Sequence, residues 1–331
     1  MNLPAVRRGG QGIITLNYWA TEQGSISTGV LAMTEKKRII TRRDFIRTGS
    51  RVVMGSLMGL PLVRKAAGHA TEKSRVVLIR NPKVTSGYGS LHADVLFDML
   101  DQAMTMLHGT ANSATAWRKL VKPYDIVGIK SNVWHYLPTP APLEDAIANR
   151  LMQTGVSAKN ISVDDRGVGG NVVFKKATAL INVRPMRTHH WSGLGTLLKN
   201  YIMFVSTPWL YHGNACERLG TIWQKPHIRG KTRLNILVMV TPLFHGIGPH
   251  HFSRKYTWPY GGLIVSTDPV AADAIGARII QAKRNAYFGK NKPISPRPLH
   301  IEAADTKFGI GNSHPDRIDL VKMGWQEDIL I

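Results

Sequence analysis

Cysteine is nearly absent: Cys216 is the only one among 331 residues. No internal disulfide can form, and neither an iron–sulfur cluster nor an all-cysteine zinc site can be built from one thiol. The hydrophobic core must therefore stabilise the fold without help from disulfides. Since the sequence places no His and Asn or Asp partner beside it, Cys216 is interpreted as a small packed side chain rather than as a nucleophile.

Long hydrophobic runs are also missing. No stretch reaches the about 18 apolar residues that a membrane-spanning helix needs. The most apolar N-terminal run, residues 52–63, is interrupted by Gly55, Gly59 and Pro61. This pattern excludes a multi-pass membrane protein, and we expect no transmembrane segment in the mature chain.

Acidic residues are scarce, with 21 Asp and Glu against 43 Lys and Arg, which gives a net charge of +22. Residues 1–70 hold eleven basic and three acidic residues, a net of +8, and the remainder therefore carries +14. Such an excess attracts anions, from acidic metabolites to lipid headgroups, envelope polymers and nucleic acid. Nucleic acid is disfavoured because no zinc-finger spacing or RNA-binding signature occurs. We expect a small anionic ligand.

An export signal is expected near the N-terminus. Residues 41–47 read Thr-Arg-Arg-Asp-Phe-Ile-Arg, and the pair Arg42 and Arg43 followed by Phe45 resembles the twin-arginine signal. A weakly apolar segment, a basic pair and a run of small residues follow up to residue 70. The alternative, a basic amphipathic helix, is weakened by the Gly and Pro residues of the apolar run. We therefore expect the twin-arginine export machinery as a partner and a periplasmic or otherwise exported protein.

The chain divides into two parts on this interpretation. Residues 1–70 form an N-terminal extension and signal peptide, and translation is expected to start at Met33 because the residues before it show no apolar period. Residues 71–331 contain no convincing linker, which favours a single domain over two. Twin-arginine export carries folded proteins, and a common reason to fold first is a cofactor inserted in the cytoplasm. This favours a transition metal or another cofactor, of unknown identity.

Short apolar runs alternate with amphipathic patterns after residue 71. Helices are expected over residues 91–107 and 142–152 and near 195–205. Strands are expected over residues 75–80, 124–129, 160–164, 179–183, 235–240 and 262–265. This alternation predicts an α/β fold with a mixed or mostly parallel sheet covered by helices on both faces. The Trp-, Tyr- and Gly-rich stretch 191–233 is expected to be an irregular excursion.

Polar residues that follow the strands are the first candidates for a site, because ligands in open α/β sheets bind beyond the carboxyl ends of the strands. The residues expected to bind a small anionic substrate are Lys130, Asn132, Arg166, Lys199 and Asn200. The residues expected to transfer protons are His189 or His190 with Asp165 or Asp273. The glycine run 167–170 is interpreted either as an anion-binding backbone nest or as a plain turn.

Two carboxylates near residue 270 have different interpretations. Asp268 is expected to cap a helix whose first residue is Pro269. Asp273 falls inside that apolar helix, where an unpaired carboxylate is costly to bury. A partner such as Lys130, Lys199 or a metal would relieve this cost.

A histidine-rich loop offers a second type of site. His245, His250 and His251 could ligate a transition metal, although their spacing matches no zinc signature. Together with Asp273 they support the hypothesis of a non-catalytic metal binder, and the basic surface supports that of an anion binder. Electron transfer through an organic cofactor is a third hypothesis, for which the sequence holds no cofactor motif.

Several of these stretches, taken in order, resemble the bacterial and archaeal family catalogued as domain of unknown function 362. The stretches are residues 125–132, 155–156, 161–166, 179–183, 189–200 and 262–273, within residues 75–285. The family has no established activity, so the resemblance implies none. Some relatives carry cysteine-rich ferredoxin segments, which this chain lacks, and no iron–sulfur cluster is expected. Relatives tend to show an Asp after the strand at 235–240, where this chain has Met239 and Thr241.

Overall fold

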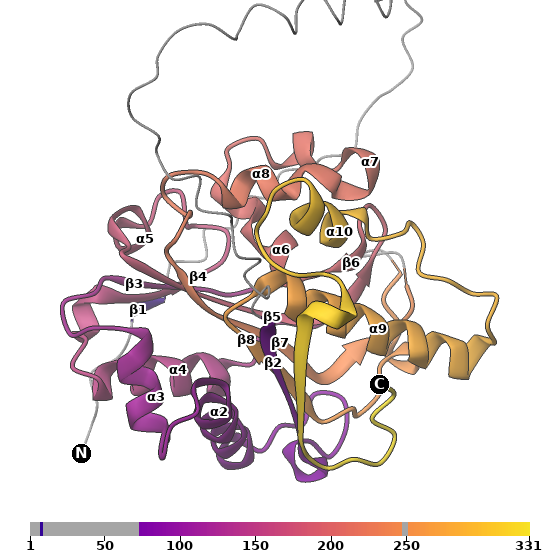
Figure 1. The fold of residues 1–331 in the computed structure, drawn as a ribbon, viewed down its shortest axis with the longest axis horizontal. Helices are drawn as coiled ribbons and strands as arrows, with labels where there is room; N and C mark the ends of the chain where they lie inside the picture. Colours follow the sequence, from indigo (N-terminus) through magenta and orange to yellow (C-terminus); the bar gives the residue numbers. More distant parts are fainter. Residues whose placement is uncertain (1–6, 9–72, 247–250) are drawn as a thin grey trace, which may run out of the picture. The chain divides into compact units, whose positions relative to one another are not determined.

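The computed structural model describes residues 7–8, 73–246 and 251–331 (Figure 1). The export signal with Arg42, Arg43 and Phe45, the expected start at Met33, and His250 lie outside the described residues. Within the described ranges no helix combines the length and the apolar character needed to cross a membrane.

One sheet organises the described part of the chain, with the strand order β1-β4-β3-β5-β7-β8-β2-β9 and β6 added to β5 (Figure 1). The strands are β1 (Arg7–Arg8), β2 (Ser74–Arg80), β3 (Val127–Lys130), β4 (Ile161–Asp164), β5 (Ala179–His189), β6 (Gly193–Gly195), β7 (Thr232–Leu243), β8 (Gly262–Ser266) and β9 (Ile318–Gly324). All of them run in one direction except β6 and β8. The predicted mixed, mostly parallel sheet is confirmed.

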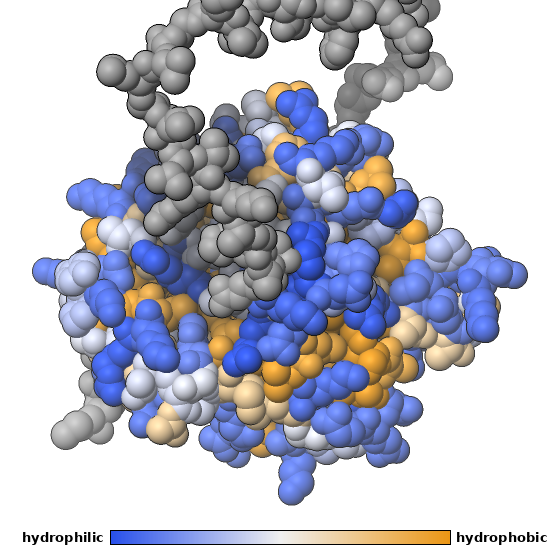
Figure 2. Space-filling model, in the orientation of Figure 1, coloured by the Kyte–Doolittle hydropathy of each residue, from blue (hydrophilic) through white to orange (hydrophobic). Residues whose placement is uncertain are grey.

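Helices cover both faces of the sheet, as predicted. One layer consists of α2 (Ala93–His108), α3 (Ser113–Leu120) and α4 (Ala141–Gln153). The other consists of α5 (Val172–Lys176), α6 (Leu197–Asn200), α7 (Gly213–Cys216), α8 (Gly220–Trp223), α9 (Pro269–Phe288) and α10 (Leu299–Thr306). Figure 1 shows the two layers on opposite sides of the strands, and Figure 2 shows that hydrophilic residues dominate one face of the surface.

The packing of β2 shows why the strands are apolar throughout. Val77 and Ile79 belong to the core under α2, whereas Val76 and Leu78 belong to the core on the opposite face. Side chains alternate between the faces of a strand, and both faces are covered here. The α2 helix matches this core with residues at helical spacing, and Gly109 ends it in the left-handed conformation. Its buried residues are Leu96, Met99, Leu100, Ala103, Met104 and Leu107.

Two predicted elements differ in form from those observed. The helix expected near 195–205 is a four-residue α6 followed by a 3-10 helix, Tyr201–Phe204. The strand expected over 179–183 continues to His189, because its second half pairs with β6 on one side and β7 on the other. The predicted cap of α9 is confirmed: the Asp268 carboxylate accepts hydrogen bonds from two amides of the first turn, and Pro269 is the first helical residue.

Candidate functional site: a buried cationic cavity

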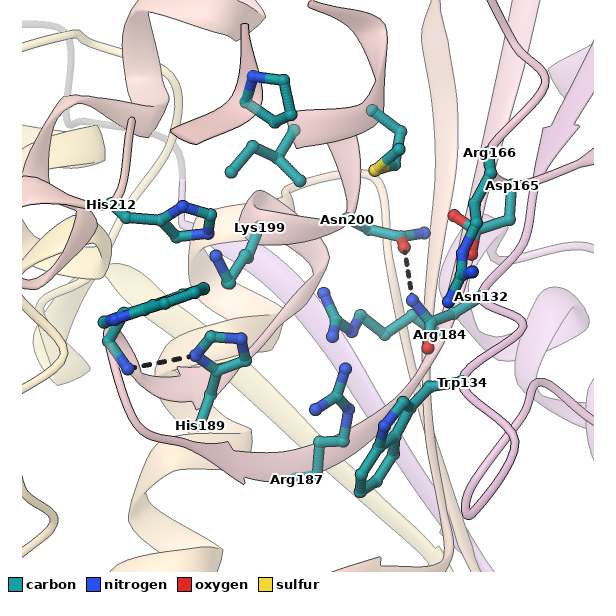
Figure 3. A pocket seen from close by; sticks show the side chains of 14 residues that line it. Asn132, Trp134, Asp165, Arg166, Arg184, Arg187, His189, Lys199, Asn200 and His212 are labelled. Carbon is teal, nitrogen blue, oxygen red and sulfur yellow. Dashed lines mark hydrogen bonds between the residues drawn. The ribbon is translucent and has the colours of Figure 1, made fainter. Parts of the chain in front are cut away.

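The long strand β5 creates the site. It pairs with β3 only over residues 179–182 and then continues past the end of β3 to His189. Beyond the carboxyl ends of β3, β4 and β5 lies a cavity of about 330 Å³ (Figure 3). Open α/β sheets bind their ligands at this edge, and the volume lies within the range of small-molecule pockets.

Six predicted site residues line the cavity: Asn132, Asp165, Arg166, His189, Lys199 and Asn200. Three others do not, namely Lys130, His190 and Asp273. The apolar residues Ile202, Met203 and Pro208 complete the lining, and five polar or aromatic lining residues were given no role by the sequence analysis: Trp134, Arg184, Arg187, Trp191 and His212. The two arginines carried a usable signal, because they follow the predicted strand 179–183, where candidate site residues are expected. The other three lie in irregular segments that show no period.

Lys130 and Asp165 form a buried ion pair, of which Asp165 lines the cavity and Lys130 does not. The Lys130 ammonium contacts the Asp165 carboxylate and also donates to the Ser131 carbonyl at 2.7 Å. The second Asp165 oxygen accepts from the Val133 amide at 2.9 Å. Burial would raise the pKa of Asp165, but Lys130 and this amide hold the pKa below its usual value. The carboxylate therefore stays ionised and fixes the loop after β3.

Asn200 connects the end of α6 with two strands. Its amide nitrogen donates to Asn182 Oδ1 at 2.9 Å and to the carbonyls of Lys130 and Val183, both at 3.2 Å. Its oxygen lies 3.4 Å from both the Lys130 ammonium and the Asn132 amide. Asn200 is thus occupied by the protein itself. Asn132 is different, since its buried Oδ1 finds no partner among the described residues.

The geometry of β5 brings Arg184 and Arg187 to the same cavity. Residues an odd number of positions apart normally point to opposite faces of a strand. Here the register of β5 against β7 shifts between Pro185 and Arg187, and such irregularities re-aim side chains. Gly195 makes room on β6, because a Cβ there would lie 2.7 Å from a guanidinium nitrogen of Arg184.

Both guanidinium groups are buried with unused hydrogen-bonding capacity. Arg184 and Arg187 are 2% and 6% exposed. Arg184 donates to the Thr196 carbonyl at 3.0 Å, and Arg187 lies over the Trp134 ring at 4.0 Å from its centre. The Nε atom of each arginine has no hydrogen-bond partner in the described part of the chain. Such groups are costly to bury and point to a missing acceptor.

The charges around the cavity do not balance. The buried basic groups are Lys130, Arg184, Arg187 and Lys199, and the buried carboxylates nearby are Asp165 and Asp273. Burial lowers the pKa of Arg184 to about 10, which leaves it charged at neutral pH. Burial and then the Arg184 charge lower the pKa of Arg187. Four basic groups against two acidic ones favour a ligand that brings negative charge.

Asp273 holds α6 in place. It is fully buried, and its two oxygens accept from the amides of Leu197 and Leu198, both at 2.9 Å. The partners that the structure shows are these main-chain amides rather than the side chains of Lys130 or Lys199. Burial raises the pKa of Asp273 to about 7, against the effect of these amides. Its contribution is to position Lys199 rather than to face the cavity.

Lys199 is 4% exposed and lacks an ordinary ionic partner. Among the described residues no carboxylate lies within ion-pairing distance of the Lys199 ammonium. The ammonium instead contacts the Cys216 sulfur at 3.7 Å. Burial lowers the pKa of Lys199 to about 8, and the charges of Arg184 and Arg187 act in the same direction. Cys216 itself is buried, as predicted, and burial raises the pKa of its thiol.

The histidines of the site are neutral. His189 accepts a hydrogen bond from the Trp191 amide through Nδ1 at 3.2 Å, which leaves the proton on Nε2. Burial and then the Lys199 charge lower the pKa of His189 well below its usual value, and they lower that of His212 to about 3. His190 stacks on His189 with ring centres 5.0 Å apart but does not line the cavity.

The glycine run 167–170 forms turns. The Gly167 amide donates to Asp164 Oδ1 and the Gly170 amide to the Gly167 carbonyl, both at 2.9 Å. Of the two interpretations left open, the structure supports the plain turn. Asn171 follows and caps α5.

The histidine-rich loop lies outside the cavity. His245 Nδ1 contacts the Arg284 guanidinium at 3.2 Å, and burial followed by the Arg284 charge lowers the pKa of His245. His251 is exposed, and His250 lies outside the described residues. In the described ranges no three His, Cys, Asp or Glu side chains are grouped as a metal site would require. The metal site at His245, His250 and His251 stays a prediction.

Fold and site together define an α/β protein with a buried cationic cavity at the carboxyl ends of its strands. Residues 166–278 match the family model described as domain of unknown function (DUF362). The matched stretch contains β5, β6, α6, β7 and β8, and thus Arg184, Arg187 and Lys199. This supports the family resemblance of the sequence. No curated protein and no solved structure matches the chain.

Proposed function

We propose that this protein is an enzyme that binds a small anion with two or more negative charges in the cavity and transfers protons on it. The observation that carries the proposal is the pair Arg184 and Arg187, buried beside an open cavity with unpartnered Nε atoms. An isolated buried charge costs on the order of several kcal/mol, and an anionic ligand offsets that cost. Carboxylate and phosphate groups match the planar guanidinium donors.

The roles of the lining residues follow from their charges and hydrogen bonds. Arg184, Arg187 and Lys199 hold the anion, and Arg166 is an exposed basic side chain of the same cavity. The neutral imidazole of His212 accepts a proton from the bound substrate, and His189, whose Nδ1 is taken by the Trp191 amide, donates to the substrate through its Nε2–H. Lys130, which does not line the cavity, and Asn200, which does, hold the neighbouring strands and α6 together through the bonds described above.

The experiment is thermal unfolding of the purified protein with sulfate, phosphate or citrate, compared with glycerol as a neutral solute. Ligands that bind the folded state raise the melting temperature by mass action. We expect stabilisation by the anions in the wild type and in Arg118→Met, an exposed control on α3, and its loss in Arg187→Met. Equal stabilisation of all three proteins would contradict the proposal.

Turnover separates an enzyme from a non-catalytic binder. The protein is incubated with an extract of small anionic metabolites, and mass spectrometry follows which compounds change. We expect the wild type to convert at least one compound that His212→Gln leaves unchanged. Anion binding without any conversion would favour the non-catalytic anion binder instead.

Export by the twin-arginine pathway to the periplasm is part of the proposal and rests on the motif at Arg42, Arg43 and Phe45. The test is cell fractionation of the full chain and of the double variant Arg42→Lys/Arg43→Lys. We expect the wild type in the envelope or periplasmic fraction and the variant in the cytoplasm. The same distribution for both would reject this route.

A further inference from the structure

We propose that Lys199 forms an imine with its substrate, so that the anion bound in the cavity carries an aldehyde or ketone group. This inference rests on the proposed function and names the substrate class more closely. It starts from Lys199, the one lysine among the cavity's described lining residues, which neither pairs with a carboxylate nor lies over an aromatic ring in the described part of the chain.

The position of Lys199 is fixed by the fold. It lies on α6, whose first amides are held by Asp273 at 2.9 Å. Figure 3 shows its side chain between those of His189 and His212 at the cavity. Its one contact with Cys216, at 3.7 Å, is a weak interaction with sulfur. The amine is thus held in place without a strong hydrogen bond or ion pair to another described residue.

The surroundings of Lys199 favour the neutral amine. The charges of Arg184 and Arg187, both on β5, disfavour the Lys199 ammonium, and the imidazoles of His189 and His212 are neutral. Burial makes the largest contribution to the lowered pKa of Lys199, which is about 8. At pH 7 this leaves about a tenth of the amine unprotonated, against less than about a thousandth for an exposed lysine. Buried lysines of this kind are the ones that serve as imine-forming nucleophiles.

The reaction balances without an oxidant or reductant. The Lys199 nitrogen attacks the carbonyl carbon and forms a C–N bond, and the carbonyl electron pair moves to oxygen, which is protonated. The nitrogen loses a proton, the C–O bond breaks, and the oxygen leaves as water. In net terms amine, carbonyl and one proton give a protonated imine and one water.

This chemistry gives each neighbour a function. Arg184 and Arg187 bind the carboxylate or phosphate and so orient the carbonyl towards Lys199. The protonated imine withdraws electrons from the adjacent carbon, and the neutral imidazole of His212 is available to accept the proton released there. A simple ion-pairing role for Lys199 would not need a lowered proton affinity.

The test is reductive trapping on the purified, exported protein. Three carbonyl compounds with two negative charges, 2-oxoglutarate, oxaloacetate and dihydroxyacetone phosphate, are each incubated with it and sodium cyanoborohydride, and peptide mass spectrometry locates the adducts. We expect at least one probe to modify Lys199 at least about tenfold faster than exposed Lys176. Excess glutarate, which has the charges but no carbonyl, should suppress the adduct on Lys199 alone.

Two variants separate this inference from the proposed function. Lys199→Arg keeps the charge and cannot form an imine, so it should still be stabilised by glutarate while showing no adduct at residue 199. If glutarate and phosphate stabilise the wild type but no probe modifies Lys199, the imine is rejected and the anion site stands. If Lys176 reacts as fast as Lys199 and glutarate does not compete, the imine is also rejected. If the wild type binds neither glutarate nor phosphate, both proposals are rejected.

Discussion

The two helical layers of this protein contrast sharply. The layer of α2, α3 and α4 has helices of 16, 8 and 13 residues, and their apolar stripes pack on one core. The other layer also contains the long helix α9, but its part that lines the cavity, between residues 191 and 231, is built from helices of three or four residues. Asn214, Ala215 and Cys216 there adopt positive φ angles of 46°, 51° and 63°.

The contrast separates stability from function. Burial of apolar side chains on regular helices stabilises the fold, whereas buried charges and strained backbone cost free energy. Strained or charged segments persist where the surrounding structure supports them and where a ligand compensates. We therefore expect variants of the first layer to change stability alone and variants of the cavity to change ligand binding.

The largest expected effect lies in the α2 layer. Leu100→Ala removes a fully buried side chain and should lower the free energy of unfolding by about 2–5 kcal/mol. Sulfate affinity should stay within a factor of about two, because Leu100 lies on the other face of the sheet from α6. Chemical denaturation and calorimetry measure the two quantities. A large loss of sulfate affinity in Leu100→Ala would contradict the separation of stability from ligand binding.

Asp273→Ala should change both the stability of the protein and its affinity for sulfate. It removes the acceptor of two buried amides at the start of α6, so we expect a loss of about 3 kcal/mol in stability together with weaker sulfate binding. The exposed Asp98→Ala on α2 is the matched control and should stay within about 0.5 kcal/mol. Unchanged sulfate affinity in Asp273→Ala would mean that α6 does not position Lys199.

Arg187→Met should show the opposite pattern to Leu100→Ala. We expect sulfate affinity to fall by about tenfold or more, because a charge-assisted hydrogen bond of about 1.5–3 kcal/mol is lost. Stability without ligand should be unchanged or higher, since the variant removes a buried charge and retains an apolar side chain over Trp134. Calorimetric titration and denaturation check both. Strong destabilisation of the free protein would assign Arg187 to the fold instead.

The smallest effect is a pH dependence. With a pKa of about 8 in the free protein, Lys199 is mostly charged at pH 7 and mostly neutral at pH 9. Sulfate keeps its charge over this range, so its affinity should fall by about tenfold as pH rises from 7 to 9. Lys199→Met should flatten the profile. An equally steep profile in that variant would assign the titration to another group.

The sequence predicted the regular part of the fold well and the site in part. The spacing of Leu96, Leu100 and Met104 predicts α2 because that helix packs one apolar stripe on a sheet. Asn132 and Asp165 were found because polar residues that follow strands meet at one edge of the sheet. The extension of β5 could not be predicted, since it depends on pairing with β6 and β7 far along the chain.

Side-chain partners were the least predictable feature. The partner of Asp273 is the main chain of residues 197–198, and no pattern of residue types reports such a contact. Arg184 and Arg187 share one cavity only because the strand register shifts between them. Trp134 enters the site through a loop without periodicity. These features depend on tertiary geometry rather than on local propensity.

A crystal structure grown with selenate, located by its anomalous scattering, tests the central claim most directly. The account predicts one selenate in the cavity, within hydrogen-bonding distance of Arg184 and Arg187 and beside Lys199. An empty cavity, with selenate bound only to exposed lysines and arginines elsewhere on the surface, would contradict it.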